Sequence, residues 1–262
     1  MLKEDLLESL ARESHIEPAA VILNRLDQAG YPRLAWDDNQ YFYPASMIKT
    51  PLALAALTLV HDSVMRLTDR FEVTQANMTV NDKPSPLVPG YSASIDELIL
   101  LMITRSDNVA TNMLYDVVRR DRATEIVQQR YHLTQTAFYR KLSGSEPLIH
   151  DPEWDGVNRN SHPASDAAEL FELVARDRVP FARYLRQTLD RQEWNNKLNA
   201  GFEPGDSFAH KTGDTDEVTH DGGILDTAQG ASYVLVVYTG MQSTDENNAK
   251  FGTFMSKLRS SL

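Results

Sequence analysis

The spacing of apolar residues changes character several times along the first 60 positions of the chain. Leucines recur at helical spacing over residues 2–14, which predicts a helix packed on the rest of the protein. Residues 19–26 form an apolar run and residues 33–42 a second strand-like segment, with turn residues at 27–32 between them. Residues 47–60 are apolar almost all round, and this pattern is typical of a buried helix.

Helical patterns dominate the middle of the chain. The spacing predicts helices over residues 95–104, 109–120, 121–130, 165–177 and 180–192. The first of them opens with Ser94-Ile95-Asp96-Glu97, a capping-box pattern. Two segments lack periodicity: a proline-rich connection that runs to residue 90, and residues 140–162, whose length is typical of a functional loop.

The C-terminal part predicts strands at residues 208–212, 222–225 and 232–238, and then a helix that follows the capping-box pattern Ser243-Thr244-Asp245-Glu246 and ends near Arg259. The simplest packing is an α+β fold with one antiparallel sheet, built from both chain ends and flanked by the terminal helices. We expect an α/β lobe of residues 1–45 and 191–262 and an inserted, mostly helical lobe of residues 46–190. The two lobes are expected to form one compact unit with its functional site in the cleft between them.

The charge balance excludes some classes of partner. The 262 residues include 26 Lys and Arg against 37 Asp and Glu, a formal net charge of −11. We therefore expect no nucleic-acid partner and no polybasic attachment to a membrane. The chain has no cysteine, which excludes disulfides and thiolate chemistry.

The N-terminal residues bear on the compartment. Residues 1–8 carry charges, and no uninterrupted apolar stretch of the kind found in a signal peptide follows them. No run approaches the roughly 20 apolar residues of a membrane span. The sequence as written predicts a cytoplasmic protein, or a periplasmic or secreted one if a leader has been removed.

Three short patterns occur in order along the chain: Ser46-Met47-Ile48-Lys49, Ser106-Asp107-Asn108 and Lys211-Thr212-Gly213. A Ser-x-x-Lys spacing arises about once by chance in a chain of this length, and each triplet has a chance expectation of roughly 0.05. All three in this order, in sensible local settings, fall to about one in a thousand or rarer. The combination therefore carries the functional argument.

The chemistry of the first pattern is coherent. Ser46 and Lys49 share one face at the start of the buried helix, whose N-terminus offers N–H groups to a developing oxyanion. A lysine desolvated near other cations has a lowered pKa and can take the serine proton. Pro51 fits less well, because it removes a hydrogen bond from the second turn. The alternative is that Lys49 only extends out of a core helix towards water.

The other two patterns also have a chemical and a structural interpretation. Ser106 can pass a proton to a leaving group and Asn108 can bind a substrate amide, or Ser106 or Asp107 can simply cap the following helix. Lys211 and Thr212 suit a substrate carboxylate, and the alternative is a solvated strand end.

Together the three patterns resemble the signature set of class A β-lactamases and penicillin-binding proteins, and the resemblance covers nearly the whole chain. It implies that Ser46 is the acylated nucleophile, that Lys49 is the base or proton relay, and that Ser106 shuttles a proton to the leaving nitrogen. Asn108 would hold the substrate amide.

The resemblance also implies the rest of the site and the reaction. Lys211, Thr212 and Gly213 would bind the substrate carboxylate, and the backbone N–H groups of Ser46 and Asp214 would form the oxyanion hole. The implied function is a serine hydrolase, acylated at Ser46 by a β-lactam or a related amide or ester and deacylated by water. We therefore expect a small-molecule substrate and no cofactor, and we expect a monomer. A D,D-peptidase or esterase on the same scaffold, or a penicillin-binding sensor that does not turn over, remains open.

The deacylating glutamate of the class A enzymes has no full counterpart. Glu146 is the candidate base, with Ile149 and His150 where the family pattern has leucine and asparagine. Counting forward from Ser106 instead places the equivalent position near Leu142. The alternative for Glu146 is a solvated loop carboxylate.

Two departures concern charge. No arginine occurs between Arg191 and Arg259, so the strand arginine that often assists carboxylate binding in the family is missing. If Asp214, Asp216 and Glu217 face the cleft, they weaken the contact with a substrate carboxylate. If they point to water from a hairpin turn, they do not.

The histidines of the same region point to no metal centre. His210 and His220-Asp221 match no standard metal-ligand spacing, so we expect structural roles for them and no metal.

Overall fold

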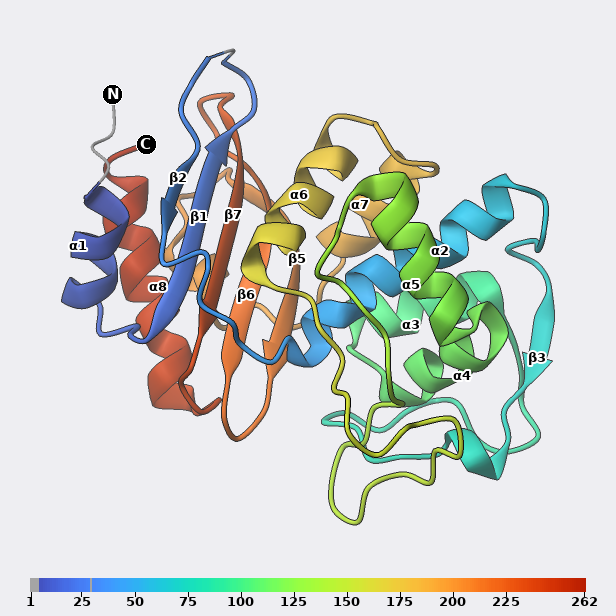
Figure 1. Ribbon diagram of the computed structural model, residues 1–262. Coiled ribbons are helices and arrows are strands. Elements are labelled where there is room, and N and C mark those ends of the chain that lie inside the picture. The colour runs from blue at the N-terminus through green and yellow to red at the C-terminus, as the bar shows by residue number, and fades with distance from the viewer. Residues whose placement is uncertain (1–4, 29) are drawn as a thin grey trace.

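The computed structural model describes residues 5–28 and 30–262 (Figure 1). Its strands are β1 (Ala19–Arg25), β2 (Leu34–Trp36), β3 (Arg70–Glu72), β4 (Ser92–Ser94), β5 (Ser207–Asp214), β6 (Thr219–Asp226) and β7 (Ser232–Thr239). Its α-helices are α1 (Leu6–Glu13), α2 (Lys49–His61), α3 (Ile95–Thr104), α4 (Asn108–Val118), α5 (Arg120–Tyr131), α6 (Ala164–Ala175), α7 (Ala182–Asp190) and α8 (Asp245–Arg259). Short 3-10 turns are η1 (Ala45–Ile48), η2 (Gln75–Asn77) and η3 (Leu198–Gly201).

The main sheet has the strand order β2-β1-β7-β6-β5, and every neighbouring pair is antiparallel. Its central pairing joins the two ends of the chain, with Ala19 opposite Thr239 and Arg25 opposite Tyr233. This confirms the predicted antiparallel sheet built from both chain ends. The first five residues of β1 are all buried, because helices cover both faces of the sheet.

Helices α1 and α8 lie side by side on one face of the sheet, as predicted for the terminal helices (Figure 1). Their apolar sides share a cluster with the sheet that includes Leu7, Leu10, Phe251, Phe254 and Met255. Of the predicted helix at 2–14, residues 2–4 lie outside the described residues. The N-cap of α8 is Thr244, whose side chain accepts from the Asn247 N–H, so the predicted box is displaced by one residue from Ser243.

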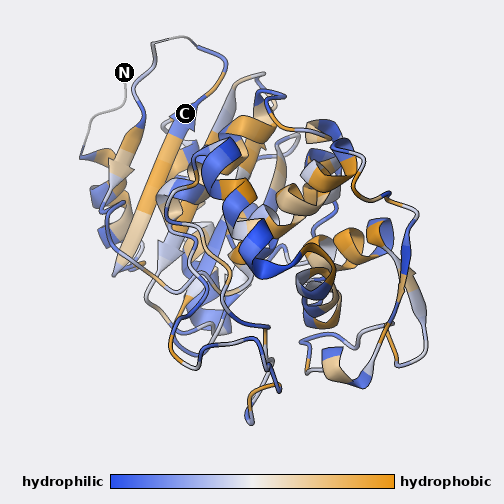
Figure 2. Ribbon diagram, turned by 45° about the vertical axis from the view of Figure 1, so that its right-hand side comes forward, coloured by the Kyte–Doolittle hydropathy of each residue, from blue (hydrophilic) through white to orange (hydrophobic). Residues whose placement is uncertain are grey.

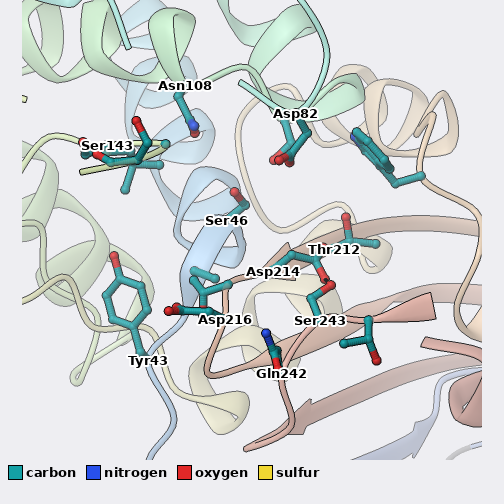
Figure 3. A pocket seen from close by; sticks show the side chains of 18 of the residues that line it. Tyr43, Ser46, Asp82, Asn108, Ser143, Thr212, Asp214, Asp216, Gln242 and Ser243 are labelled. Atoms are coloured by element: carbon teal, nitrogen blue, oxygen red, sulfur yellow. Dashed lines mark hydrogen bonds between the residues drawn. The ribbon is translucent and has the colours of Figure 1, made fainter. Parts of the chain in front are cut away.

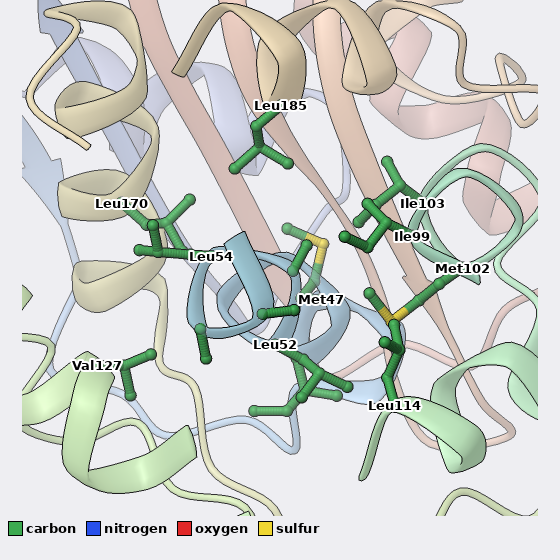
Figure 4. Close-up of a cluster of buried hydrophobic side chains, with 14 of the residues drawn as sticks. Met47, Leu52, Leu54, Ile99, Met102, Ile103, Leu114, Val127, Leu170 and Leu185 are labelled. Atoms are coloured by element: carbon green, nitrogen blue, oxygen red, sulfur yellow. The ribbon is translucent and has the colours of Figure 1, made fainter. Parts of the chain in front are cut away.

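Helix α2 is the centre of the second and larger core, on the other side of the sheet (Figure 4). Eleven successive residues from Lys49 to Leu59 are buried, so this helix has no solvent-facing side. Pro51 causes no kink, because α2 begins at Lys49 and Pro51 falls in its first turn, where the N–H groups have no helical partner.

Helices α3 to α7 surround α2, and their ends agree with the predicted ranges within two residues. Figure 2 shows the apolar residues gathered along the strands and the inner helices. Helix α6 packs against β1, β6 and β7, although it belongs to the stretch 46–190. The division of the chain into two lobes therefore stays a prediction.

Three details of the strands differ from the sequence prediction. Strands β5 and β6 are longer than the predicted ranges 208–212 and 222–225. The segment 33–42 pairs only over β2, because Asp37 takes a φ of +52° and turns the backbone out of the sheet. The connection before residue 95 holds a small hairpin, β3 with β4, instead of being wholly irregular. In the described residues, no helix is long and apolar enough to cross a membrane.

Candidate active site

Ser46 lies in η1, the turn that leads into α2. The preceding Ala45 has a φ of +47°, so the chain enters this turn through a sharp bend. Gly213 of β5 lies against the same bend, where an added Cβ would meet the Pro44 oxygen at 2.9 Å. The absence of a side chain at Gly213 lets β5 approach the backbone around Ser46 closely.

Lys49 follows Ser46 by one turn and is fully buried, with 0% of its surface exposed. Its Nζ lies 2.5 Å from the Ser106 carbonyl oxygen, 2.8 Å from Asn108 Oδ1 and 3.1 Å from Ser106 Oγ. Burial first, and then the positive charge of Lys211, hold the pKa of Lys49 well below its ordinary value. Among the described residues, Ser46 is not one of the hydrogen-bond partners of this amine.

Lys211 reaches the same hydroxyl from the other side. Its Nζ donates to Ser106 Oγ at 3.0 Å and to the Thr212 carbonyl oxygen at 2.9 Å. Complete burial is the main cause that lowers the pKa of Lys211 to about 7, and the charge of Asp214 opposes the shift. One serine oxygen therefore lies between two desolvated amines.

The segment between α3 and α4 serves both the site and the helix. Ser106 has a φ of +57°, which places its hydroxyl between the lysines. The side chain of Asp107 caps α4 by accepting from the Ala110 N–H at 2.9 Å. The amide of Asn108 binds Lys49 with its oxygen and the Val80 carbonyl with its nitrogen. The capping interpretation holds for Asp107 and not for Ser106, and the chemical roles of Ser106 and Asn108 stay predictions.

These residues border a cavity of about 840 Å³. It is lined by Ser46, Ser106, Asn108, Glu146, Thr212 and Asp214 among others. Figure 3 shows Ser46 at the middle of the labelled side chains, with Asn108 and Ser143 to one side and Thr212 to the other. Lys49 and Lys211 lie buried beneath Ser106.

The carboxylate of Asp214 is already neutralised by the protein. It accepts from the buried Lys197 at 2.6 Å and from the hydroxyls of Thr219 and Ser243. Partial burial raises the pKa of Asp214, but the charge and hydrogen bond of Lys197 outweigh burial, and the pKa is lowered. Asp214 is one of the three acids expected to weaken the contact with a substrate carboxylate, and its charge is paired with Lys197.

The other two acids differ in position. Asp216 lines the cavity, whereas Glu217 does not and is largely exposed, 4.0 Å from Arg159. Glu217 therefore points to water, as such charges commonly do. Among the described residues of this turn, Asp216 is the acid that lines the cavity without an ion-pair partner.

The comparisons with known proteins address the whole chain. A family model described as the β-lactamase enzyme family matches residues 2–258. The chain belongs to the β-lactamase enzyme family. It is a serine hydrolase that resembles the class A enzymes.

Solved structures agree with the family in fold. PBP-A superposes with a TM-score of 0.80 at 24% identity and covers 98% of this chain and 97% of its own. A β-lactamase from Sphaerobacter thermophilus gives a TM-score of 0.82 at 19% identity, with coverage of 100% and 98%. One from Xanthomonas campestris pv. campestris gives 0.82 at 22% identity, with coverage of 98% and 97%. A search of curated proteins finds no match.

The loop of residues 140–162 departs from what the family resemblance implies. Glu146 lines the cavity, but it is exposed and has no hydrogen-bond partner among the described residues. Leu142 also lines the cavity, is only 7% exposed, and is held by Asn112, which binds its N–H at 2.8 Å and its carbonyl at 2.9 Å. Of the two candidate positions for the deacylating base of this β-lactamase-family chain, the one that the protein holds in place is therefore the aliphatic Leu142.

Four charged residues of the site carry no sequence signal of their own. Lys197 meets Asp214 only through the fold, and Asp82 reaches the cavity from the connection after η2. Arg140 and Arg159 line the cavity from the long loop. The length of that loop predicts a function, and several of its residues line the cavity, but its irregular pattern does not indicate which residues face inward.

Two histidines of this β-lactamase-family chain, His210 and His220, are buried and hydrogen-bonded within the protein. His210 lies between Asp221 and Asn195, at 2.7 and 3.0 Å. His220 lies 2.8 Å from the Tyr43 carbonyl and accepts from the Thr239 N–H. Burial is the main cause that lowers the pKa of His220 to about 4. Residues 5–28 and 30–262 contain no group of three potential metal ligands.

Proposed function

We propose that the protein catalyses acyl transfer with Ser46 as nucleophile and Lys49 as base. The observation that carries the proposal is the pair of buried lysines within 3.1 Å of one serine oxygen. Two like charges in a desolvated site do not both stay protonated at neutral pH. Neutral Lys49 accepts a proton, and charged Lys211 remains for a substrate anion.

In the proposed acylation step, Ser46 Oγ attacks the carbonyl carbon of the substrate while its proton passes to Lys49 Nζ. The backbone N–H groups of Ser46 and Asp214 stabilise the oxyanion. When the tetrahedral intermediate collapses, the bond to the leaving nitrogen breaks. That nitrogen takes a proton from Ser106 Oγ, which Lys49 replaces, so the amine is neutral again and the serine carries an ester.

The substrate class follows from the surrounding groups. Lys211 and Thr212 suit a carboxylate on the leaving side, with Gly213 next to them in the predicted substrate site, and Asn108 suits an amide on the acyl side. We therefore propose β-lactams and related peptide-like amides or esters as substrates. No cofactor takes part in the proposed reaction.

The test of the nucleophile is intact-protein mass spectrometry with benzylpenicillin. Wild type is expected to gain the mass of one penicilloyl group, and Ser46→Ala to gain none. Ser145→Ala is the matched control, because Ser145 also lines the cavity but is exposed on the loop. An adduct on Ser46→Ala, or none on wild type, contradicts the proposal.

Deacylation separates two candidate functions. Activation of water by Glu146 gives a β-lactamase that turns over. The exposure of Glu146 and the presence of aliphatic Leu142 favour a second candidate, a penicillin-binding protein whose ester persists. A buried apolar side chain cannot deprotonate water.

A nitrocefin time course distinguishes the two candidates. A stoichiometric burst with little later hydrolysis supports the penicillin-binding candidate, and steady turnover that Glu146→Gln abolishes supports the β-lactamase. Under the penicillin-binding candidate, Leu142→Glu is expected to raise the deacylation rate by about tenfold or more, since general bases contribute 10²–10⁴-fold.

Two further properties remain to be tested: that the protein is a monomer, and whether it is cytoplasmic, periplasmic or secreted. Light scattering in solution tests the first and cell fractionation tests the second.

A further inference from the structure

Two arginines from the long loop face the cavity and are stacked on aromatic rings. The guanidinium carbon of Arg140 lies 4.8 Å from the ring centre of Trp154, and that of Arg159 lies 4.2 Å from the ring centre of Tyr43. Stacking orients a guanidinium plane and leaves the N–H donors at its edge available.

Neither guanidinium donates a hydrogen bond to a carboxylate of the described residues. Among the described residues, the side chain of Arg140 makes one hydrogen bond, from Nε to the Lys141 carbonyl at 3.4 Å, and has no carboxylate within 4.0 Å. Arg159 has Glu217 at 4.0 Å, which is beyond hydrogen-bond distance. By contrast, the nearby Arg120 binds Asp151 at 2.6 Å as part of the loop's own structure.

A buried asparagine holds the two arginines next to each other. Asn160 is 0% exposed, and its Oδ1 accepts from the N–H groups of Tyr139 and Arg140 at 2.7 and 3.0 Å. Its Nδ2 donates to the Arg140 carbonyl at 3.0 Å. Because Asn160 directly follows Arg159, its hydrogen bonds to the backbone of Arg140 join the two arginine positions across the loop.

The phenol of Tyr43 lies within the influence of both cations. Burial raises the pKa of Tyr43, and the charges of Arg140 and Arg159 oppose that shift. Tyr43 stands three residues before Ser46, and Figure 3 shows Tyr43 and Ser143 on the side of Ser46 away from Thr212. The arginines therefore face the opposite end of the cavity from the predicted carboxylate site.

We propose that Arg140 and Arg159 form a second anion site, which binds a carboxylate on the acyl side of the substrate. The inference rests on the proposed function, since attack by Ser46 defines which side is the acyl side. The substrate class becomes acyl donors with two carboxylates, one on each side of the bond that breaks. Asp82, Glu146, Asp216 and Asp245 also line the cavity and repel an anion there, so the preference depends on the arginines.

Benzylpenicillin and carbenicillin are suitable probes, because they differ by one carboxylate on the acyl side chain. We expect wild type to be acylated faster by carbenicillin, measured as the second-order rate of adduct formation by mass spectrometry. In the Arg140→Gln/Arg159→Gln double variant, the carbenicillin rate is expected to fall about tenfold or more, as loss of charge-assisted hydrogen bonds implies. The benzylpenicillin rate is expected to stay within about twofold.

Arg122→Gln is the matched control for net charge, since Arg122 is an exposed residue of α5 outside the cavity. It is expected to change neither rate. An equal loss for both penicillins in the double variant, or no loss for either, overturns the inference.

Noncovalent binding separates this inference from the proposed nucleophile. In a Ser46→Ala background, calorimetry is expected to show tighter binding of carbenicillin than of benzylpenicillin. The difference is expected to disappear when Arg140→Gln and Arg159→Gln are added. Equal binding of the two ligands by the Ser46→Ala protein overturns the anion site even if acylation at Ser46 is demonstrated, and the site survives if acylation fails but the difference is found.

Discussion

The hydroxyl of Ser106 lies between two amines that share one desolvated region, so the two lysines titrate as a pair. The observable pKa values therefore belong to Lys49 and Lys211 together. Loss of the first proton creates the base that acylation needs. Loss of the second removes the cation that attracts an anionic substrate.

The pH dependence of acylation follows from this pair. As pH rises through about 7, the pKa assigned to Lys211, the site loses positive charge and KM for an anionic acyl donor is expected to rise. The negative charge of Asp82 favours the charged form of Lys211, so Asp82→Asn is expected to move this alkaline limb to lower pH. Acylation rates between pH 5.5 and 9 measure the limb.

A neutral ester substrate serves as the control for this pH profile, because it does not need the lysine charge and its KM is expected to show no alkaline limb. An alkaline limb that stays in place in Asp82→Asn contradicts the assignment to Lys211.

The part of the candidate site that lies in local motifs could be predicted from the sequence. The part that depends on contacts between distant segments could not. Ser46 and Lys49 are one turn apart, so their chemistry is visible in four consecutive residues. Lys197 and Asp214 form an ion pair between segments that share no pattern, so the neutral state of Asp214 emerges only from the fold. Glu146 suited the family pattern by composition, but the backbone of the loop decides which side chain is held inward.

At the scale of elements, the loop of residues 140–162 is anchored by a buried ion pair. Arg120 of α5 binds Asp151 with both terminal nitrogens, at 2.6 and 3.0 Å, and the two side chains are 8% and 3% exposed. Asp151 also accepts from the Lys141 N–H at 2.7 Å. The pair therefore fixes the start of the loop beside Leu142.

Breaking this pair is expected to destabilise the protein. Arg120→Gln leaves the carboxylate of Asp151 buried without its cation, which costs about 3 kcal/mol of the free energy of unfolding. Urea denaturation measures the loss. The control is Arg122→Gln, two residues away on the exposed side of α5, which is expected to change stability by less than about 0.5 kcal/mol. Equal stability of the two variants contradicts the anchoring role.

Element length decided which elements could be predicted. The sequence located helices α2 to α7 and strands β1 and β7 within two residues of their ends, whereas β5 and β6 extend beyond the predicted ranges 208–212 and 222–225. Strands β3 and β4 have three residues each, which is too short for a period to appear. Residues 37–42 keep a strand-like composition, but the left-handed backbone at Asp37 ends β2, and composition does not reveal such a bend.

At the scale of the whole molecule, the site costs stability, because the fold buries two amines that the unfolded chain exposes to water. Unfolded lysine keeps its ordinary pKa of 10.5, whereas Lys211 in the fold has a pKa of about 7. Between these values the unfolded state binds a proton that the folded state does not, so stability rises with pH. Lys49 adds to the effect with the same sign.

The expected rise is about 2 kcal/mol between pH 7 and pH 9 for Lys211, from 1.36 kcal/mol per pKa unit. Urea denaturation at pH 7, 8 and 9 measures it, and Lys211→Met is expected to flatten the slope. Lys250→Met, a partly exposed lysine of α8, is the control and is expected to leave the slope unchanged. A rise of wild-type size in Lys211→Met contradicts this account.

The pairing of β1 with β7 has a consequence for how the protein is made. Residue 19 lies opposite residue 239, so the middle of the sheet cannot close until almost all of the chain has left the ribosome. The segment around Ser46 is synthesised long before β5, the strand that covers it. The apolar residues of α2 are therefore exposed while the rest of the chain is synthesised, and during this interval the nascent protein most needs a chaperone.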